Sequence, residues 1–242
     1  MRWTSAKYHD LFDRKKNIEF FTELAKDAGR VLDVGAGTGR LSIAMAQAGA
    51  RVAAVEQDAN LRALMKQNIK ELPKDVGNRI DILRGDILNI STGRRFPLII
   101  LSGTLESFFT RDQRFELLKR FHETLEPGGR LVFDLWSMNI GEFSLKEVDR
   151  IADNGNEYIR KMACSIDKFQ HIAKIRYIYE TYVSGNYYDQ VEETQEIAMV
   201  QPREISEGLM EAGFRDFNFY GGYDRRPYDL YSRILVVEAW KK

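Results

Sequence analysis

The chain has 242 residues, which is enough for one large domain or for one domain with an insertion. Its 36 Lys and Arg residues balance its 36 Asp and Glu residues, so no overall positive charge attracts it to nucleic acid phosphates. A single cysteine excludes an internal disulfide, and three widely spaced histidines indicate no metal site. Without a membrane-length apolar run or a visible signal peptide, we expect a cytoplasmic protein with no membrane partner.

The first 27 residues form an aromatic-rich lead or lid. Its later part, Asn17 to Asp27, has helical spacing of apolar residues, whereas Tyr8 and Phe12 come before that predicted helix. Aromatic side chains serve ligand contact and simple packing equally well, so both interpretations stay open for this segment.

The segment from Val31 to Leu41, VLDVGAGTGRL, carries the most specific pattern in the chain. A strand predicted over 30–34 turns through glycines at 35, 37 and 39 into a helix predicted over 39–49. Glycines permit a tight turn and a close approach of backbone to a ligand, and the new helix offers unpaired N–H groups. The spacing Gly-x-Gly-x-Gly differs from the Gly-x-Gly-x-x-Gly of dinucleotide-binding folds.

Acidic residues follow three successive predicted strands. Asp33 ends the first, Glu56 follows the strand at 52–55, and Asp86 follows the strand at 80–83. The carboxyl ends of parallel strands form one crevice, and ligands bind there. A carboxylate at the end of the second strand can accept from both hydroxyls of a ribose.

The middle of the chain continues the alternation of strands and helices. Residues 96–101 form a continuous apolar run suited to a buried parallel strand, and a helix is predicted over 112–126. The sequence LEPGG then leads into an apolar strand at 130–135.

These motifs together resemble the class I S-adenosylmethionine-dependent methyltransferases, and in particular their small-molecule branch. DVGAGTG matches the first motif of that family, LEPGG before an apolar strand is a further signature, and the resemblance covers residues 28–135. It implies a doubly wound α/β fold with a seven-stranded, mostly parallel sheet, and S-adenosyl-L-methionine as the cofactor.

The resemblance also assigns roles at matched positions. The glycine loop would pack against the methionine part of the cofactor, with Asp33 near its amino group. Glu56 would bind the ribose, Asp86 and Ile87 the adenine, and the segment after the fourth strand would approach the reacting methyl group. The implied cofactor-binding residues are Asp33, Gly35, Ala36, Gly37, Gly39, Glu56, Gln57, Asp86, Ile87, Ser102 and Gly103.

Residues for the substrate and for catalysis are less well defined. Some relatives carry a histidine near the position of Ser107 that acts as a base, whereas this chain has Ser107 with Glu106 beside it. A base is needed only if the nucleophile is protonated before attack. No catalytic residue is assigned, although Tyr8, Glu106 and Tyr179 are candidate bases. The candidate substrate residues are Tyr8, Glu106, Trp136 and Tyr179.

Residues 140–200 predict an antiparallel β insertion inside a single methyltransferase domain that spans 1–242. Strands are predicted at 158–162, 172–183 and 187–200, with a hairpin turn at 184–186. The insertion could cover a substrate or form a homodimer. A helix at 202–212 and two strands at 214–220 and 234–240 complete the fold, with a solvated loop at 221–231 between the strands.

The favoured function is transfer of a methyl group to N or O of a small molecule by in-line displacement. A tRNA or rRNA methyltransferase is the alternative, which a basic face on the folded surface would favour, although no nucleic acid partner is expected. A third reading is a non-catalytic domain that binds S-adenosylmethionine. A nicotinamide dehydrogenase is disfavoured by the glycine spacing and the position of Asp86.

Overall fold

The computed structural model describes residues 2–12, 16–85, 88 and 93–242, and the chain divides into two compact units. The first unit consists of residues 1–14 and 140–199, and the second of residues 15–139 and 200–242. The N-terminal lead is divided between them. Helix α1 (Arg2–Phe12) belongs to the first unit, and helix α2 (Lys16–Ala28) belongs to the second.

The second unit contains a seven-stranded sheet with the order β10-β11-β5-β4-β1-β2-β3. Strand β11 runs antiparallel to both of its neighbours, and the other pairs are parallel, which confirms the predicted mostly parallel sheet. The strands are β1 (Arg30–Val34), β2 (Arg51–Glu56), β3 (Ile80–Arg84), β4 (Phe96–Ser102), β5 (Leu125–Trp136), β10 (Asp216–Tyr220) and β11 (Ile234–Trp240).

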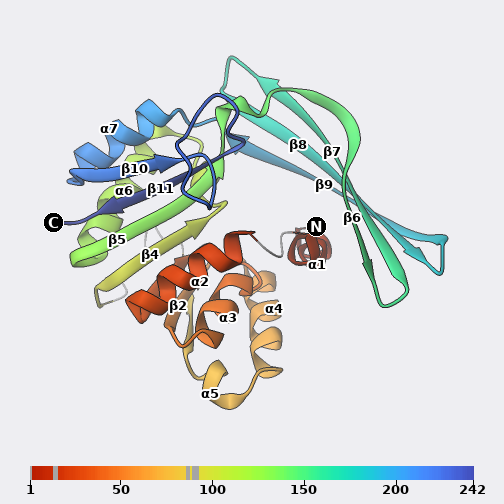
Figure 1. Ribbon diagram of the computed structural model, residues 1–242, viewed down its shortest axis with the longest axis horizontal. Helices are drawn as coiled ribbons and strands as arrows, with labels where there is room; N and C mark the ends of the chain where they lie inside the picture. The colour runs from red at the N-terminus through yellow and green to blue at the C-terminus, as the bar shows by residue number, and fades with distance from the viewer. Residues whose placement is uncertain (1, 13–15, 86–87, 89–92) are drawn as a thin grey trace. The chain divides into compact units, whose positions relative to one another are not determined.

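Helices cover both faces of this sheet (Figure 1). On one face lie α2, α3 (Arg40–Gln47), α4 (Ala59–Lys70) and the short α5 (Lys74–Gly77), and on the other lie α6 (Arg111–Thr124) and α7 (Pro202–Ala212). The core under the first group joins Phe21, Met45 and Met65 of the helices to Leu98 and Ile100 of β4. Because both faces are covered, the central strands are apolar throughout rather than alternating.

Two local features of the structure do not follow from the sequence pattern. Helix α5 begins after Pro73, and its Val76 and Gly77 N–H groups both donate to the carbonyl of Pro73. Residues 127–129, which precede the strand predicted at 130–135, lie within β5, because Gly128 N–H donates to Lys241 O and Lys241 N–H donates to Gly129 O. Both features arise from hydrogen bonds that the local sequence pattern does not reveal.

Strand β1 lies at the point where the direction of winding reverses. The chain passes from β1 to β2 and β3 on one side, and then returns to place β4 and β5 on the other side of β1. In open α/β sheets, ligands bind at the carboxyl ends of the strands at this switch point. The glycine loop after Val34 lies there.

The first unit contains a four-stranded antiparallel sheet in the order β6-β7-β8-β9. Its strands are β6 (Phe143–Asp153), β7 (Asn156–Asp167), β8 (Ile172–Val183) and β9 (Asn186–Ala198). The predicted hairpin turn is present, with positive φ at Ser184 (49°) and Gly185 (79°), as a type I′ turn requires. The sequence pattern missed β6 because its charged, largely exposed residues lack strand-like alternation.

Within the part of the chain that the structure describes, no helix is both long and apolar enough to cross a lipid bilayer.

Candidate functional site

The glycine loop between β1 and α3 is fixed to the sheet by its backbone. The N–H groups of Gly35 and Ala36 both donate to the carbonyl of Val55 in β2, at 2.9 and 3.0 Å. A Cβ atom at Gly35 would collide with Thr104, and one at Gly39 would collide with Met65. Packing inside the protein therefore explains why these two positions are glycine.

Gly37 has a different environment. Its φ is +58°, and no heavy atom of the described residues comes within 4 Å of a Cβ built there. Its N–H donates to Glu56 Oε2 at 2.9 Å. The loop therefore presents backbone to open space at Gly37, which is the arrangement that a closely approaching ligand needs.

Glu56 ends β2 and is only 7% exposed. Its Oε2 accepts from Gly37 N–H and its Oε1 accepts from Asp58 N–H at 2.8 Å. A carboxylate has about four acceptor positions, so capacity remains for two adjacent hydroxyl donors. The neighbouring Gln57 is exposed. Glu56 thus supports the glycine loop in addition to the ligand contact that the sequence predicts.

Asp33 is 2% exposed near the carboxyl end of β1. Its Oδ2 accepts from Ser42 Oγ at 2.5 Å. Burial raises the pKa of Asp33 to about 6, against the lowering effects of the Ser42 hydrogen bond and the Arg40 charge, while Glu56 adds to the increase. A cation beside Asp33 would remove much of this cost of burying the charge.

The loop after β4 is held by a buried acid that the sequence analysis missed. Asp134 of β5 accepts from Gly103 N–H at 2.6 Å, Ser102 Oγ at 3.1 Å and Tyr223 Oη at 2.6 Å. Burial raises its pKa although all three hydrogen bonds lower it. The position of this charged residue inside the otherwise apolar strand LVFDLW could have indicated its role from the sequence alone. The 221–231 loop, predicted to be solvated, thus reaches the core through Tyr223.

Glu106 lies in a 3₁₀ turn, η1 (Leu105–Ser107), directly after this loop. It is 3% exposed, and its Oε2 atom has no hydrogen-bond partner among the described residues. Burial raises the pKa of Glu106 to about 8; backbone N–H groups of Glu106 and Trp136 lower it, and the charge of Asp134 raises it. A buried polar atom without a partner is costly, and strongly perturbed pKa values cluster at functional sites.

The structure brings together one part of the predicted site. The carboxyl edge of the second unit's sheet contains Asp33, Gly35, Ala36, Gly37, Gly39, Glu56, Gln57, Ser102, Gly103, Glu106 and the half-buried Trp136. Asp86 and Ile87 lie outside the described residues.

The two predicted tyrosines belong to the first unit. The rings of Tyr8 in α1 and Tyr179 in β8 are stacked, with centroids 4.9 Å apart, and both side chains are buried. The Tyr8 hydroxyl shares a 3.0 Å hydrogen bond with Thr181 Oγ1. Packing within this unit accounts for both rings as described. In the described parts of both units, no group of three or more His, Cys, Asp or Glu residues is arranged to hold a metal ion.

The known proteins that resemble this chain are all methyltransferases in the comparisons described below. A family model described as a methyltransferase domain matches residues 31–129. An uncharacterised methyltransferase of Oceanobacillus iheyensis is 28% identical over 151 residues, which are 62% of this chain and 66% of that protein. The tRNA1(Val) (adenine(37)-N6)-methyltransferase of Glaesserella parasuis is 31% identical over 124 residues, which are 45% of this chain and 52% of that protein. The matches thus span between about half and two thirds of these relatives.

A solved structure has the same fold. The amino pentose methyltransferase CalS10 of Micromonospora echinaspora, with S-adenosylmethionine bound, superposes with a TM-score of 0.72 at 18% identity, covering 92% of this chain and 88% of that one. The strand order, the glycine loop and these matches indicate a methyltransferase domain over residues 31–129, in a chain with the class I methyltransferase fold. Its cofactor is S-adenosylmethionine, and the open space at Gly37 together with the spare acceptor positions of Glu56 fits that group.

Proposed function

We propose that this enzyme methylates a small molecule, at N or O, with an amine nitrogen as the preferred acceptor. Support comes from the structural neighbour, which acts on an amino pentose, and from the neutral net charge of the chain. Bound S-adenosylmethionine supplies a methyl group on a sulfonium cation, so the protein need not form a covalent intermediate. Its task is to hold the acceptor in line with that methyl group and to exclude water.

The predicted cofactor-binding residues would contact different parts of S-adenosylmethionine, according to their charge and shape. Asp33 would face the cofactor's ammonium group, since a buried carboxylate is stabilised by a neighbouring cation. Glu56 would accept from the ribose hydroxyls. The loop from Gly35 to Gly39 would pack against the methionine part, with Ser102 and Gly103 near the reacting methyl group. Asp86, Ile87 and Gln57 stay predicted contacts, as do Tyr8, Trp136 and Tyr179 for the substrate.

The unpartnered carboxyl oxygen of Glu106 is the observation that favours an amine. An amine enters as an ammonium ion and must lose a proton before its lone pair can attack. A carboxyl group with a pKa near 8 can accept that proton once it is ionised, as the pH rises through about 8, but its carboxylate is far too weak a base to ionise an alcohol. Glu106 would therefore bind the ammonium form through Oε2 and take its proton.

A tRNA methyltransferase is the second candidate, because one of the matched relatives methylates adenine 37 of a tRNA. That relative matches less than half of this chain, and the match supports the shared cofactor domain rather than a shared acceptor. A non-catalytic domain that binds S-adenosylmethionine would share the cofactor site but turn over no acceptor.

The test begins with calorimetric titration of the whole chain with S-adenosylmethionine and, separately, with NAD. We expect micromolar binding of the first and none of the second. Transfer of a labelled methyl group to a pool of small amines, a pool of sugars with hydroxyls only, and total tRNA then separates the candidates. Labelling of tRNA alone would contradict the proposal, and tight binding without labelling of any pool would favour the non-catalytic domain.

Replacement of Glu56 by alanine should weaken S-adenosylmethionine binding by about 1–3 kcal/mol through loss of charged acceptors. It should also lower the free energy of unfolding by roughly 1–3 kcal/mol, because the N–H groups of Gly37 and Asp58 lose their partner. Calorimetry and urea unfolding measure the two effects. Unchanged affinity in the folded variant would exclude the ribose contact.

S-adenosylmethionine affinity should fall as the pH is lowered through about 6, because protonation of Asp33 removes the charge that faces the cofactor's ammonium group. The window from pH 5 to 7 lies below the usual pKa of an α-amino group, so the ligand's own ammonium stays charged. Calorimetry across this window should show the decline in the native chain and its loss in Asp33→Asn. An equal decline in both proteins would assign the pH dependence to another group.

A further inference from the structure

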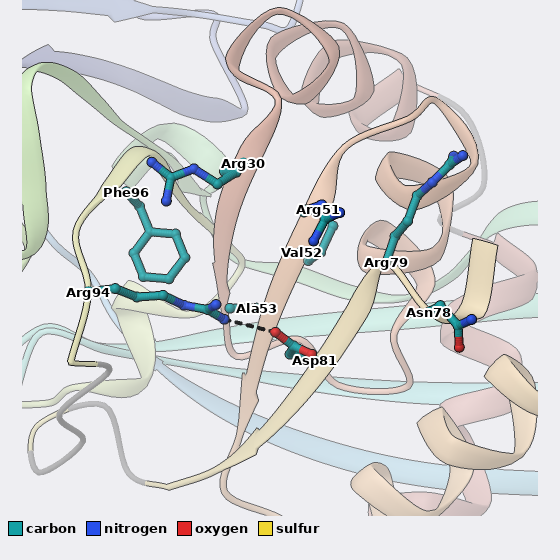
Figure 2. A pocket seen from close by; sticks show the side chains of 9 residues that line it. All are labelled: Arg30, Arg51, Val52, Ala53, Asn78, Arg79, Asp81, Arg94 and Phe96. Atoms are coloured by element: carbon teal, nitrogen blue, oxygen red, sulfur yellow. Dashed lines mark hydrogen bonds and ion pairs between the residues drawn. The ribbon is translucent and has the colours of Figure 1, made fainter. Parts of the chain in front are cut away.

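A cavity lies at the opposite edge of the seven-stranded sheet from the glycine loop, at the amino ends of β1 to β4 (Figure 2). Its volume is about 150 Å³. Residues at the starts of four strands line it: Arg30, Arg51, Val52, Ala53, Asn78, Arg79, Asp81, Arg94 and Phe96. The lining therefore contains four arginines and one carboxylate. This local excess of positive charge contrasts with the zero net charge of the whole chain.

The register of the sheet places three of these arginines in a row. Arg30 of β1 is paired with Arg51 of β2. Arg79 immediately precedes β3, and its carbonyl accepts from Val52 N–H. Neighbouring strands lie about 4.8 Å apart, so the three side chains leave the sheet edge from adjacent positions. Like charges in such positions repel one another, and this arrangement costs stability unless something compensates it.

The outer arginines each have a protein partner. Arg30 pairs with Glu126, Arg79 Nη1 donates to Ala46 O at 3.0 Å, and Arg94 Nη2 lies 2.9 Å from Asp81 Oδ2. These contacts hold the side chains in place but are largely exposed to solvent, so the ion pairs add little stability. A guanidinium has five N–H donors, so the contacts of Arg30 and Arg79 leave donors of these two side chains available.

The central arginine differs from its neighbours. Arg51 stands between Arg30 and Arg79 and is exposed, and its side chain makes no hydrogen bond or ion pair within the described part of the chain. Figure 2 shows its side chain between Arg94 on one side and Arg79 on the other, with the Arg94–Asp81 contact below it. The charge at the middle of the row is therefore the one that remains uncompensated.

We propose that this cavity binds a compact dianion of the phosphate class, either inorganic phosphate or a small phosphate monoester. A dianion supplies the charge that Arg51 and its neighbours lack, and guanidinium groups match tetrahedral oxyanions by paired N–H donors. The volume lies well below the roughly 300–1,000 Å³ of sites for larger ligands, so a single anionic group fits better than a length of RNA backbone.

This site is separate from the cofactor site. Arg30 and Arg51 begin the strands whose other ends carry Asp33 and Glu56, so about 10–17 Å of strand divides the two edges. An anion bound at the arginine row makes no contact with the glycine loop. The inference therefore stands independently of the identity of the methyl acceptor.

Calorimetric titration of the whole chain with inorganic phosphate, at constant ionic strength maintained with chloride, tests the proposal. We expect saturable binding with one phosphate per chain. Arg51→Gln should weaken it about tenfold or more, since a hydrogen bond to a charged group is lost. The matched control is Arg203→Gln, which removes an exposed arginine of α7, and it should bind phosphate as the native chain does.

Three results would overturn the proposal: no saturable heat with phosphate, equal weakening in both variants, or a short RNA that binds at the row while phosphate does not. S-adenosylmethionine titration of the same samples separates the two sites. Arg51→Gln should bind the cofactor normally, so loss of phosphate binding with retained cofactor binding tests this site alone.

Discussion

Replacing Gly37 by valine should reduce S-adenosylmethionine affinity by about a hundredfold or more, equivalent to roughly 3 kcal/mol, while the chain stays folded. The Cβ of residue 37 enters space that no described protein atom occupies, so the new side chain obstructs the ligand rather than the core. The positive φ of +58° adds strain of about 1–2 kcal/mol to the folded state. Calorimetry gives the affinity, and urea unfolding gives the strain.

Gly128→Val is the matched control for that variant. Gly128 has a φ of +75° and, among the described residues, no neighbour within 4 Å of its built Cβ, but it lies near the start of β5, away from the glycine loop. The control should show a similar loss of stability with normal cofactor affinity. If Gly37→Val bound the cofactor as well as the control does, the loop could not be the cofactor's contact surface.

Glu106→Gln should lower kcat/KM for methyl transfer to an amine by about 10²–10⁴, the usual contribution of a positioned general base. Cofactor affinity should stay unchanged. In the native enzyme the rate should rise as the pH increases through about 8, because the carboxyl group becomes the proton acceptor only when it ionises. The variant should lack that rise. A native-like rate and pH profile in the variant would exclude Glu106 as the base.

The same residue has a second, structural consequence. The pKa of Glu106 is about 8 in the folded state against 4.5 for the free group, so the native state holds this proton more tightly than the unfolded state. The free energy of unfolding should therefore fall as the pH rises from 4.5 to about 8 and then level off. At 1.36 kcal/mol per pKa unit, the loss is on the order of 5 kcal/mol.

Urea unfolding at pH 5 and at pH 9 measures this loss. Asp33 and Asp134, whose pKa values are also raised, contribute in the same direction, so the comparison between proteins isolates Glu106. The native chain should lose more stability than Glu106→Gln between the two pH values, because the amide does not titrate. An identical loss in both would mean that the carboxyl group is not buried as described, whatever its role in catalysis.

The sequence by itself determined the cofactor class and most of the sheet. Apolar runs bounded by glycines and acids predicted β1, β2 and β4 to within one residue at each end, and the core of β5, because buried parallel strands are continuously apolar. The Gly-x-Gly-x-Gly motif and the acids at the strand ends could also be recognised from the sequence. Their effect depends on short-range spacing along one chain segment.

Tertiary structure alone decided the features that join distant segments. Asp134, Gly103 and Tyr223 meet across three separate elements, and only this contact explains the acid inside β5. Burial of Glu106, rather than its identity, raises its pKa and leaves one oxygen without a partner. The arginine row exists because sheet register aligns Arg30 and Arg51. Burial and sheet register depend on contacts between residues that are far apart in sequence, so a local sequence pattern cannot predict them.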